Sequence, residues 1–161
     1  MVTSLTNLSS YDSKSVPDGN SFKIHLVVSQ WNKTITSDLK EGAINTLLKN
    51  NVKQANIKVW YVPGSFELVY GTKKAQSFDP DAVIAIGSII QGQTKHFDFV
   101  CQAVSQGIKD LNIQSEVPVI FCVLTDNNLK QAQDRSGGKH GNKGVEAAVA
   151  ALKMIQLRYT H

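Results

Sequence analysis

Polar side chains suited to proton transfer and anion binding follow one apolar segment, residues 81–90 (DAVIAIGSII). The turn after this segment, residues 91–96, has the sequence QGQTKH. Histidine has an ordinary pKa near neutrality, so His96 is suited to moving protons. If a helix starts at this histidine, the unpaired backbone N–H groups of its first turn will attract an anion. The turn therefore predicts an active site in which a histidine acts beside a bound anion, with polar side chains from Gln91, Gln93, Thr94, Lys95 and His96.

Three other short segments carry side chains that could complete such a site: residues 30–32 (QWN), 63–67 (PGSFE) and 125–126 (TD). Trp31 and Phe66 offer flat apolar faces to a planar ring, although an aromatic residue next to a strand is more often part of the core. A carboxylate at a helix start is favoured by the helix dipole with or without a ligand, so Glu67 alone decides nothing. The hypothesis of a site depends on all four segments meeting in space.

The elements that would bring them together alternate along the chain. Apolar runs predict strands, and apolar residues at helical spacing predict helices, with Asn32 as a candidate cap of the first helix. This alternation predicts an α/β fold, a three-layer α-β-α sandwich with a four-stranded parallel sheet of the flavodoxin-like type. Loops after parallel strands gather at one edge, which would unite the four segments. The strands are expected at 22–29, 57–62, 81–90 and 117–124, and the helices at 34–50, 65–76, 96–111, 127–135 and 145–158.

Length and composition bound the organisation of the chain. With 161 residues and 42% hydrophobic content, we expect one domain at 21–161. Residues 1–20 are polar and contain Pro17 and Gly19, so a flexible arm, or an edge segment recruited by a partner, is expected there. No apolar run is long enough for a membrane helix and no secretory signal is recognisable, which favours a soluble, cytoplasmic protein.

Charge and cysteine content exclude several classes of site. The net charge of +4 comes from scattered lysines without interleaved aromatic residues, so we expect no nucleic-acid partner. Cys101 and Cys122 lie among apolar neighbours, as is typical of buried free thiols. The four histidines lack ligand spacing and neither cysteine has a close partner, so no metal site is expected.

Residues 135–144 (RSGGKHGNKG) contain a segment rich in glycine and lysine, preceded by Arg135. The glycine and lysine segment does not fit the GxxxxGK[ST] spacing of a P-loop and follows a helix, so a loop between helices is expected. Arg135 could clamp an anion through its forked donors, or could simply be a cation placed favourably near a helix C-terminus.

Four motifs together carry a resemblance to a known family. They are SQWN at 29–32, VPGSFELV at 62–69, GSIIQGQTKHFDFVC at 87–101, and FCVLTDNNLKQAQDRSGGKHGNKG at 121–144. In this order they resemble the 6,7-dimethyl-8-ribityllumazine synthase family, whose members carry out the penultimate step of riboflavin biosynthesis. The resemblance extends from about residue 22 to the end of the chain.

The resemblance implies a reaction and a set of roles. The reaction is the condensation of 5-amino-6-(D-ribitylamino)uracil with (S)-3,4-dihydroxy-2-butanone 4-phosphate, releasing phosphate and water, with no metal or organic cofactor. His96 would move protons, and Phe121 would be lent by an adjacent subunit. The other implied roles are ring stacking by Trp31; ribityl and ring binding by Ser65, Phe66 and Glu67; backbone lining by Ser88, Ile89 and Ile90; phosphate binding by Gln93, Thr94 and Arg135; and support by Lys143.

Two positions depart from the family pattern, and the assembly is left open. Gln91 stands where Arg or Lys is common, and Gln93 where Ala, Ser or Glu is commoner. The family forms pentamers, and some members build sixty-subunit shells of twelve pentamers. An insertion associated with pentamer-only members is absent here, which favours a shell, whereas Pro17 in the N-terminal segment weighs against it. Riboflavin synthase is an open candidate partner.

Two competing functions are weighed against the enzyme. A non-catalytic lumazine-binding, flavin-binding or cage-forming protein would not need Thr94, His96 and Arg135 together. A generic flavodoxin-like nucleotide-binding module would carry a phosphate loop after the first strand, but that loop here, SQWNKT, contains no glycine. The sequence therefore favours an enzyme that handles a phosphorylated small molecule.

Overall fold

The computed structural model describes residues 7–160 and contains a four-stranded parallel sheet with the strand order β2-β1-β3-β4. Strands and helices alternate as the sequence predicts, and every predicted main element is present. The strands are β1 (Ile24–Ser29), β2 (Ile57–Val62), β3 (Ala82–Ile90) and β4 (Val119–Asp126), and the helices are α1 (Lys33–Lys49), α2 (Leu68–Gln76), α3 (His96–Gln114), α4 (Leu129–Arg135) and α5 (Lys143–Arg158).

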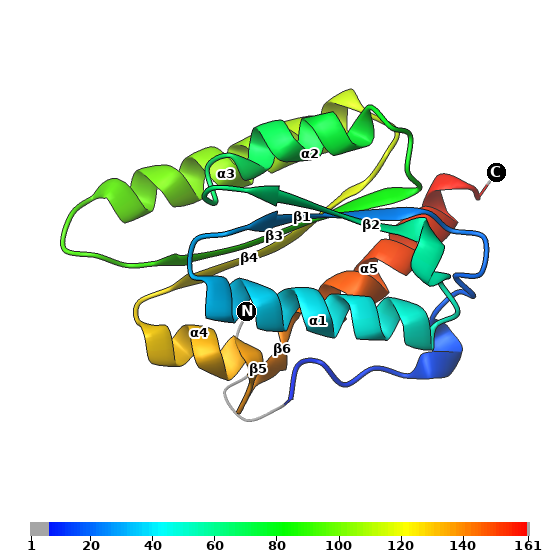
Figure 1. The fold of residues 1–161 in the computed structure, drawn as a ribbon, viewed down its shortest axis with the longest axis horizontal. Helices are drawn as coiled ribbons and strands as arrows, with labels where there is room; N and C mark the ends of the chain where they lie inside the picture. Colours follow the sequence, from blue (N-terminus) through cyan, green and yellow to red (C-terminus); the bar gives the residue numbers. More distant parts are fainter. Residues whose placement is uncertain (1–6, 161) are drawn as a thin grey trace.

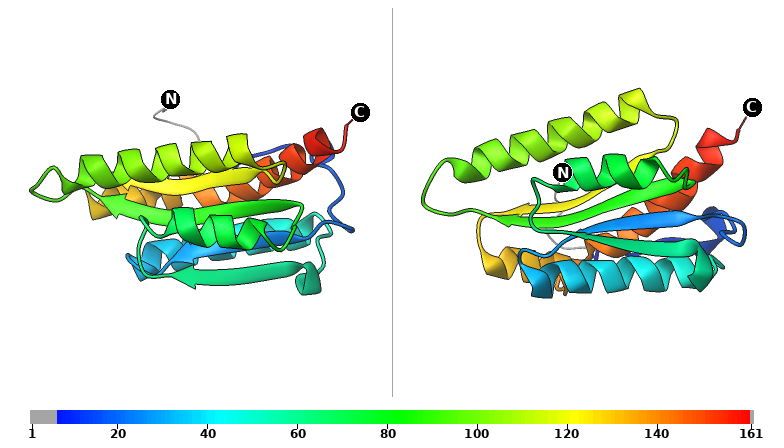
Figure 2. Two further views of the ribbon diagram at one scale, coloured as in Figure 1. Left: turned by 90° about the horizontal axis from the view of Figure 1, so that it is seen from above. Right: turned by 45° about the horizontal axis from the view of Figure 1, so that its top comes forward.

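Helices cover both faces of this sheet. Helices α2 and α3 lie on one face, and α1, α4 and α5 lie on the other (Figures 1 and 2). The three-layer α/β fold class is therefore confirmed. All four strands run in the same direction, so their carboxyl ends share one edge, on the left in Figure 1.

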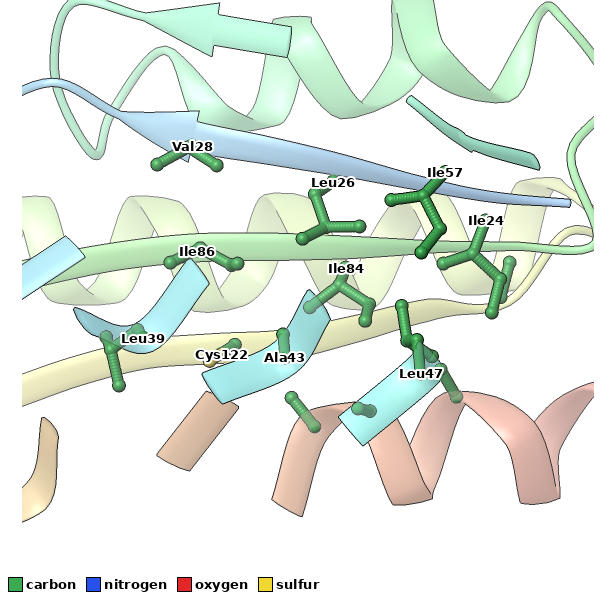
Figure 3. Close-up of a cluster of buried hydrophobic side chains, with 14 of the residues drawn as sticks. Ile24, Leu26, Val28, Leu39, Ala43, Leu47, Ile57, Ile84, Ile86 and Cys122 are labelled. Atoms are coloured by element: carbon green, nitrogen blue, oxygen red, sulfur yellow. The ribbon is translucent and has the colours of Figure 1, made fainter. Parts of the chain in front are cut away.

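The alternation of side chains along the strands divides the core in two. Ile24, Leu26 and Val28 of β1 point toward α1 and α5, together with Ile84 and Ile86 of β3 (Figure 3). The intervening residues of each strand pack against α2 and α3. β1 and the first seven residues of β3 are buried on both faces, which explains why their sequences are nearly continuous apolar runs.

Two helices begin at residues other than the predicted ones, one because a turn precedes it and one because a side chain caps its first turn. Helix α2 begins at Leu68 because the three residues before it form a turn, closed by the N–H of Leu68 donating to the carbonyl of Ser65 at 3.2 Å. Helix α5 begins at Lys143, since the side chain of Asn142 accepts from the N–H of Gly144 at 2.8 Å.

The segment SGGKHGNKG is not wholly irregular. It contains a short antiparallel hairpin of β5 (Ser136–Gly138) and β6 (Gly141–Asn142). Gly137 and Gly141 have φ angles of 125° and 84°, which only glycine adopts readily. The prediction of a plain loop was wrong in this respect. Two glycines permit a hairpin here, and the spacing of apolar residues, from which strands were predicted, does not reveal it.

Residues 7–20 lie against the domain on the side of α1. The N–H of Gly19 donates to the carbonyl of Asn50 at 2.8 Å, and the N–H of Leu8 donates to the carbonyl of His140 at 3.2 Å. A short 3-10 helix, η1 (Ser13–Ser15), lies between these contacts, and a second, η2 (Gln54–Asn56), precedes β2. Residues 1–6 of the expected arm lie outside the described residues, and the boundary at residue 21 stays a prediction.

Both cysteines are free thiols, as predicted. Cys122 is fully buried in the α1/α5 half of the core, whereas Cys101 is only half-buried. Burial raises the pKa of Cys122 to about 12. Within residues 7–160, none of the helices has the length and apolar character needed to cross a membrane.

Candidate active site

Backbone and side-chain hydrogen bonds tie together the loops at the carboxyl edge of the sheet. After β1, the N–H of Gln30 donates to the carbonyl of Val62 at 2.8 Å, and the N–H of Trp31 donates to the carbonyl of Pro63 at 3.1 Å. These two bonds fix the loop after β1 against the loop after β2.

Asn32 connects the same loop to β3. It occupies the cap position of α1, as predicted, but its side chain makes no capping hydrogen bond. Its φ of 53° turns the residue out of the helical path, and its Nδ2 donates to the carbonyl of Ser88 at 3.0 Å. The predicted cap position is therefore confirmed, although the left-handed backbone directs the amide toward the neighbouring strand and not toward the helix.

The joined loops surround a pocket of about 850 Å³. It lies where the strand order reverses between β1 and β3, the position at which open α/β sheets bind ligands. The N-terminal end of α3 forms its other wall. The lining residues come from four segments: Trp31; Gly64, Ser65, Phe66 and Glu67; Ser88, Ile89, Ile90, Gly92 and Thr94; and His96, Phe97, Phe99, Val100 and Ala103.

Close packing beneath the pocket depends on a glycine. A Cβ atom on Gly87 would lie 2.8 Å from both Leu68 Cδ1 and Ser65 Oγ, so only glycine allows the loop before α2 to approach β3 this closely. The hydroxyls of Ser65 and Ser88 are buried and have no hydrogen-bond partner within the described residues. Buried polar groups are normally paired, so these two hydroxyls are candidates to bind a ligand.

The N-terminal end of α3 combines His96 with Thr94. The hydroxyl oxygen of Thr94 accepts a hydrogen bond from the N–H of His96 at 3.4 Å. The imidazole of His96 is exposed and lines the pocket at the N-terminal end of the helix. There the N–H of Asp98 already donates to the carbonyl of Lys95 at 3.1 Å, whereas the N–H of Phe97 has no partner among the described residues. The structure thus brings Thr94 and His96 together at the pocket, and their roles in anion binding and proton transfer stay predictions.

Sequence reasoning missed the apolar residues of α3 that line the pocket. Phe99, Val100 and Ala103 follow His96 at spacings of three, four and seven, so they lie on the same helical face. That spacing was visible in the sequence and could have identified them. Gly64 and Gly92, which lie in segments predicted to form the site, also line the pocket, as does Phe97, which no pattern indicated.

The aromatic residues at the rim are exposed and do not belong to the core. Trp31 is 70% exposed and Phe66 is 60% exposed, although both line the pocket. Glu67 Oε2 lies 2.9 Å from the position that a Cβ on Gly64 would occupy, so glycine at 64 makes room for the carboxylate. The reading of Trp31 and Phe66 as core residues is therefore excluded.

Four residues assigned to the site by the resemblance do not line this pocket: Gln93, Phe121, Arg135 and Lys143. Gln93 is exposed in the turn before α3. Phe121 lies on the edge strand β4 and is 36% exposed. Arg135 and Lys143 belong to the opposite helix layer, where both contact Glu146.

The β4 end of the rim also stays outside the pocket lining. The N–H of Gln91 donates to the carbonyl of Asp126 at 2.9 Å, which joins the ends of β3 and β4. Burial raises the pKa of the Asp126 carboxyl, and the positive charge of Arg135 opposes this shift. Three of the four segments expected at the rim thus line the pocket. The fourth, residues 125–126, does not line it and is hydrogen-bonded to the end of β3.

Comparison with known proteins identifies the family. The sequence model described as 6,7-dimethyl-8-ribityllumazine synthase matches residues 21–159. The chain belongs to this family. It is 59% identical over 160 residues to the 6,7-dimethyl-8-ribityllumazine synthase of Christiangramia forsetii, covering 98% of this chain and 95% of the relative.

Other relatives agree. The proteins of that name from Flavobacterium johnsoniae and Porphyromonas gingivalis are 57% and 53% identical to this chain, over 98% of its length and 84% and 98% of theirs. The family resemblance read from the four motifs is confirmed. No comparison supports the alternative of a non-catalytic binding or cage protein.

Proposed function

We propose that this protein condenses 5-amino-6-(D-ribitylamino)uracil with (S)-3,4-dihydroxy-2-butanone 4-phosphate to give 6,7-dimethyl-8-ribityllumazine, phosphate and water. One observation supports this most directly. In a chain of this family, a single pocket combines exposed aromatic faces, two unpartnered buried hydroxyls and a histidine at a helix N-terminus.

The first part of the proposal concerns the ribitylaminouracil. Trp31 and Phe66 would offer their flat faces to the pyrimidine ring. The hydroxyls of Ser65 and Ser88 would pair with polar atoms of the substrate, and Glu67 would accept from ribityl hydroxyls. The backbone of Ile89 and Ile90, at the end of β3, would complete the recognition of the ring edge.

The second part concerns the phosphorylated substrate. The N–H groups at the start of α3, with the side chains of Gln93 and Thr94, would hold the phosphate. Phosphate carries more negative charge than these neutral donors can balance, so a cation should also be present. We assign this role to Arg135, whose planar fork matches a phosphate group.

His96 would move the protons of the reaction. The amine of the uracil attacks the ketone and water leaves, giving a Schiff base. Removal of a proton from the neighbouring carbon then lets phosphate depart and leaves an enol. The enol takes up a proton to become a ketone, and attack of the ribitylamino nitrogen on this ketone closes the ring with loss of a second water. Each step needs a proton taken or given near the same place, which suits one imidazole at the pocket wall. Holding the two substrates together would supply much of the remaining acceleration.

Arg135 and Lys143 belong to the helix layer that lies across the sheet from α3, so we propose that both reach the pocket of an adjacent subunit. Phe121, exposed on the edge strand, would likewise contribute to the pocket of an adjacent subunit. The protein would then be a homo-pentamer with active sites at its interfaces. A sixty-subunit shell, an association with riboflavin synthase and a cytoplasmic location are extensions of this proposal.

The activity is tested directly by mixing the purified protein with both substrates and following lumazine absorbance and fluorescence. Product formation well above the uncatalysed rate is expected. Ligand binding without product, detected as quenching of Trp31 fluorescence, would instead indicate a binding protein on this fold.

The shared site is tested by mixing two variants of strongly reduced activity. His96→Ala and Arg135→Ala chains, refolded together in equal amounts, should regain about a quarter of the intact sites if each site uses residues from two neighbours. The separately refolded variants are the control. Absence of any gain in pentamers proven mixed by native mass spectrometry would contradict the shared site.

A further inference from the structure

Three charged side chains form a compact cluster on the side of the sheet away from α2 and α3. Arg135 ends α4, and Lys143 and Glu146 lie in the first turn of α5. Glu146 Oε1 lies 2.6 Å from Arg135 Nη2, and Glu146 Oε2 lies 3.3 Å from Lys143 Nζ. One carboxylate thus holds two cations, one with each oxygen.

The guanidinium of Arg135 is fixed from a second direction. Its Nη1 donates to the carbonyl of His140 at 2.8 Å, in the turn between β5 and β6. A guanidinium has five N–H donors, and these two bonds use only two of them. The remaining donors can serve an anion while the group itself is already oriented.

The position of Glu146 also has a simpler explanation, in which the carboxylate only stabilises its own helix. A carboxylate in the first turn of a helix is favoured by the helix dipole, and Asn142 already caps α5. On that explanation Glu146 only stabilises the helix. The geometry argues for more, because the carboxylate leaves its own helix to reach the end of α4, eleven residues earlier.

We propose that Glu146 is a positioning residue that holds the guanidinium of Arg135, and the ammonium of Lys143, in the orientation needed to receive the substrate phosphate. This inference rests on the proposed function, in which Arg135 is the phosphate clamp. A free arginine side chain must lose rotational freedom when it binds an anion, and prior orientation removes that cost. It also keeps two like charges near each other without mutual repulsion.

The sign of the effect separates positioning from simple charge. Removing a carboxylate next to an anion site should strengthen anion binding if only Coulomb forces mattered. Positioning predicts the opposite. In Glu146→Gln the KM for the butanone phosphate should rise about tenfold, and the inhibition constant of inorganic phosphate should rise with it. The KM for the ribitylaminouracil should stay within about twofold.

The experiment compares Glu146→Gln with Glu146→Asp, Arg135→Ala and the double variant Arg135→Ala/Glu146→Gln, all in the assembled protein. Glu146→Asp keeps the charge but has a shorter reach, so it should weaken phosphate binding as well. In the double variant the second change should add much less than it does alone, because Glu146 acts mainly through Arg135 and only the contribution of Lys143 is left. Lys130→Gln, which removes the exposed Lys130–Asp134 pair on the same α4, is the matched control and should leave every constant unchanged.

The outcomes are distinct. If Arg135→Ala leaves the KM for the butanone phosphate unchanged, the clamp itself is refuted. If Arg135→Ala raises that KM but Glu146→Gln lowers it or leaves it unchanged, the clamp stands and the positioning role is overturned. If Glu146→Gln lowers the melting temperature without shifting either phosphate constant, the carboxylate only stabilises the helix, and the proposal is likewise wrong.

Discussion

Two regions of the sheet hold the same residue types in different arrangements. At the carboxyl end, Trp31, Phe66 and His96 are exposed and surround an open pocket. Toward the amino end, His25, the second residue of β1, and Phe78, in the loop before β3, pack on Trp60 in the middle of β2; ring centroids of Trp60 and Phe78 are 5.1 Å apart and those of His25 and Trp60 5.8 Å apart.

Charge follows the same division. Lys58 lies 4.2 Å from the centroid of the Trp60 ring and 4.8 Å from that of Phe78, so cations cover the aromatic faces at the amino end. At the carboxyl end, Trp31 and Phe66 instead line the open pocket. The comparison teaches that position in a parallel sheet decides whether a histidine with two aromatic residues lines a pocket or packs against its neighbours.

The largest expected difference concerns the two histidines. His96→Ala should lower kcat about a hundredfold to ten-thousandfold, because it removes the proton-transfer group, yet should leave measurable turnover from substrate proximity. His25→Ala should leave kcat within about threefold. Single-turnover assays at saturating substrates measure both. Equal losses in the two variants, with both folded, would erase the distinction between the two ends.

Trp60 should matter for stability and not for substrate binding. Trp60→Ala removes a packed ring and should lower the free energy of unfolding by about 3 kcal/mol. The KM values of the remaining folded protein should not change. Urea denaturation at a fixed protein concentration gives the first quantity. A change of less than about 0.5 kcal/mol would show that the amino-end cluster contributes little packing.

Trp31→Ala should have the complementary effect. The exposed side chain contributes little to stability, so the free energy of unfolding should change by less than about 0.5 kcal/mol. Loss of the stacking face should raise the KM for the ribitylaminouracil about tenfold, and Trp31→Phe should restore most of it. An unchanged KM in Trp31→Ala would remove this residue from the ring site.

The smallest expected effect is a pH dependence from His25. Burial lowers the pKa of His25 below its ordinary 6.5, and the positive charge of Lys58 adds to this shift. The unfolded chain therefore binds a proton first as pH falls, so stability decreases below about pH 6.5. The free energy of unfolding of His25→Gln should decrease less between about pH 7 and pH 5 than that of the unchanged protein. Above about pH 7 the free energies of the two proteins should change with pH at about the same slope. Parallel curves throughout that range would contradict this origin of the dependence.

The fold and most of the pocket could be predicted from the sequence, because local patterns determine them. The strand at 57–62 has the predicted bounds, and the other strands and all five main helices differ by at most three residues at either end. Seven of the eight residues of the predicted ring site, all but Phe121, line one pocket together with Thr94 and His96. Parallel strands bring their carboxyl ends together whatever the details of packing, so these residues had to meet.

Other features were decided only by tertiary structure. No local pattern indicates that Asn32 would bridge to the carbonyl of Ser88, since the bond spans 56 residues and depends on a left-handed backbone. The partners of Arg135 likewise depend on how the hairpin folds between α4 and α5. The sequence by itself thus determined which strands form the sheet and which residues reach its carboxyl edge, through periodicity and chain direction. Three-dimensional packing alone decided which side of the sheet each charge occupies, because that depends on the crossovers and not on spacing.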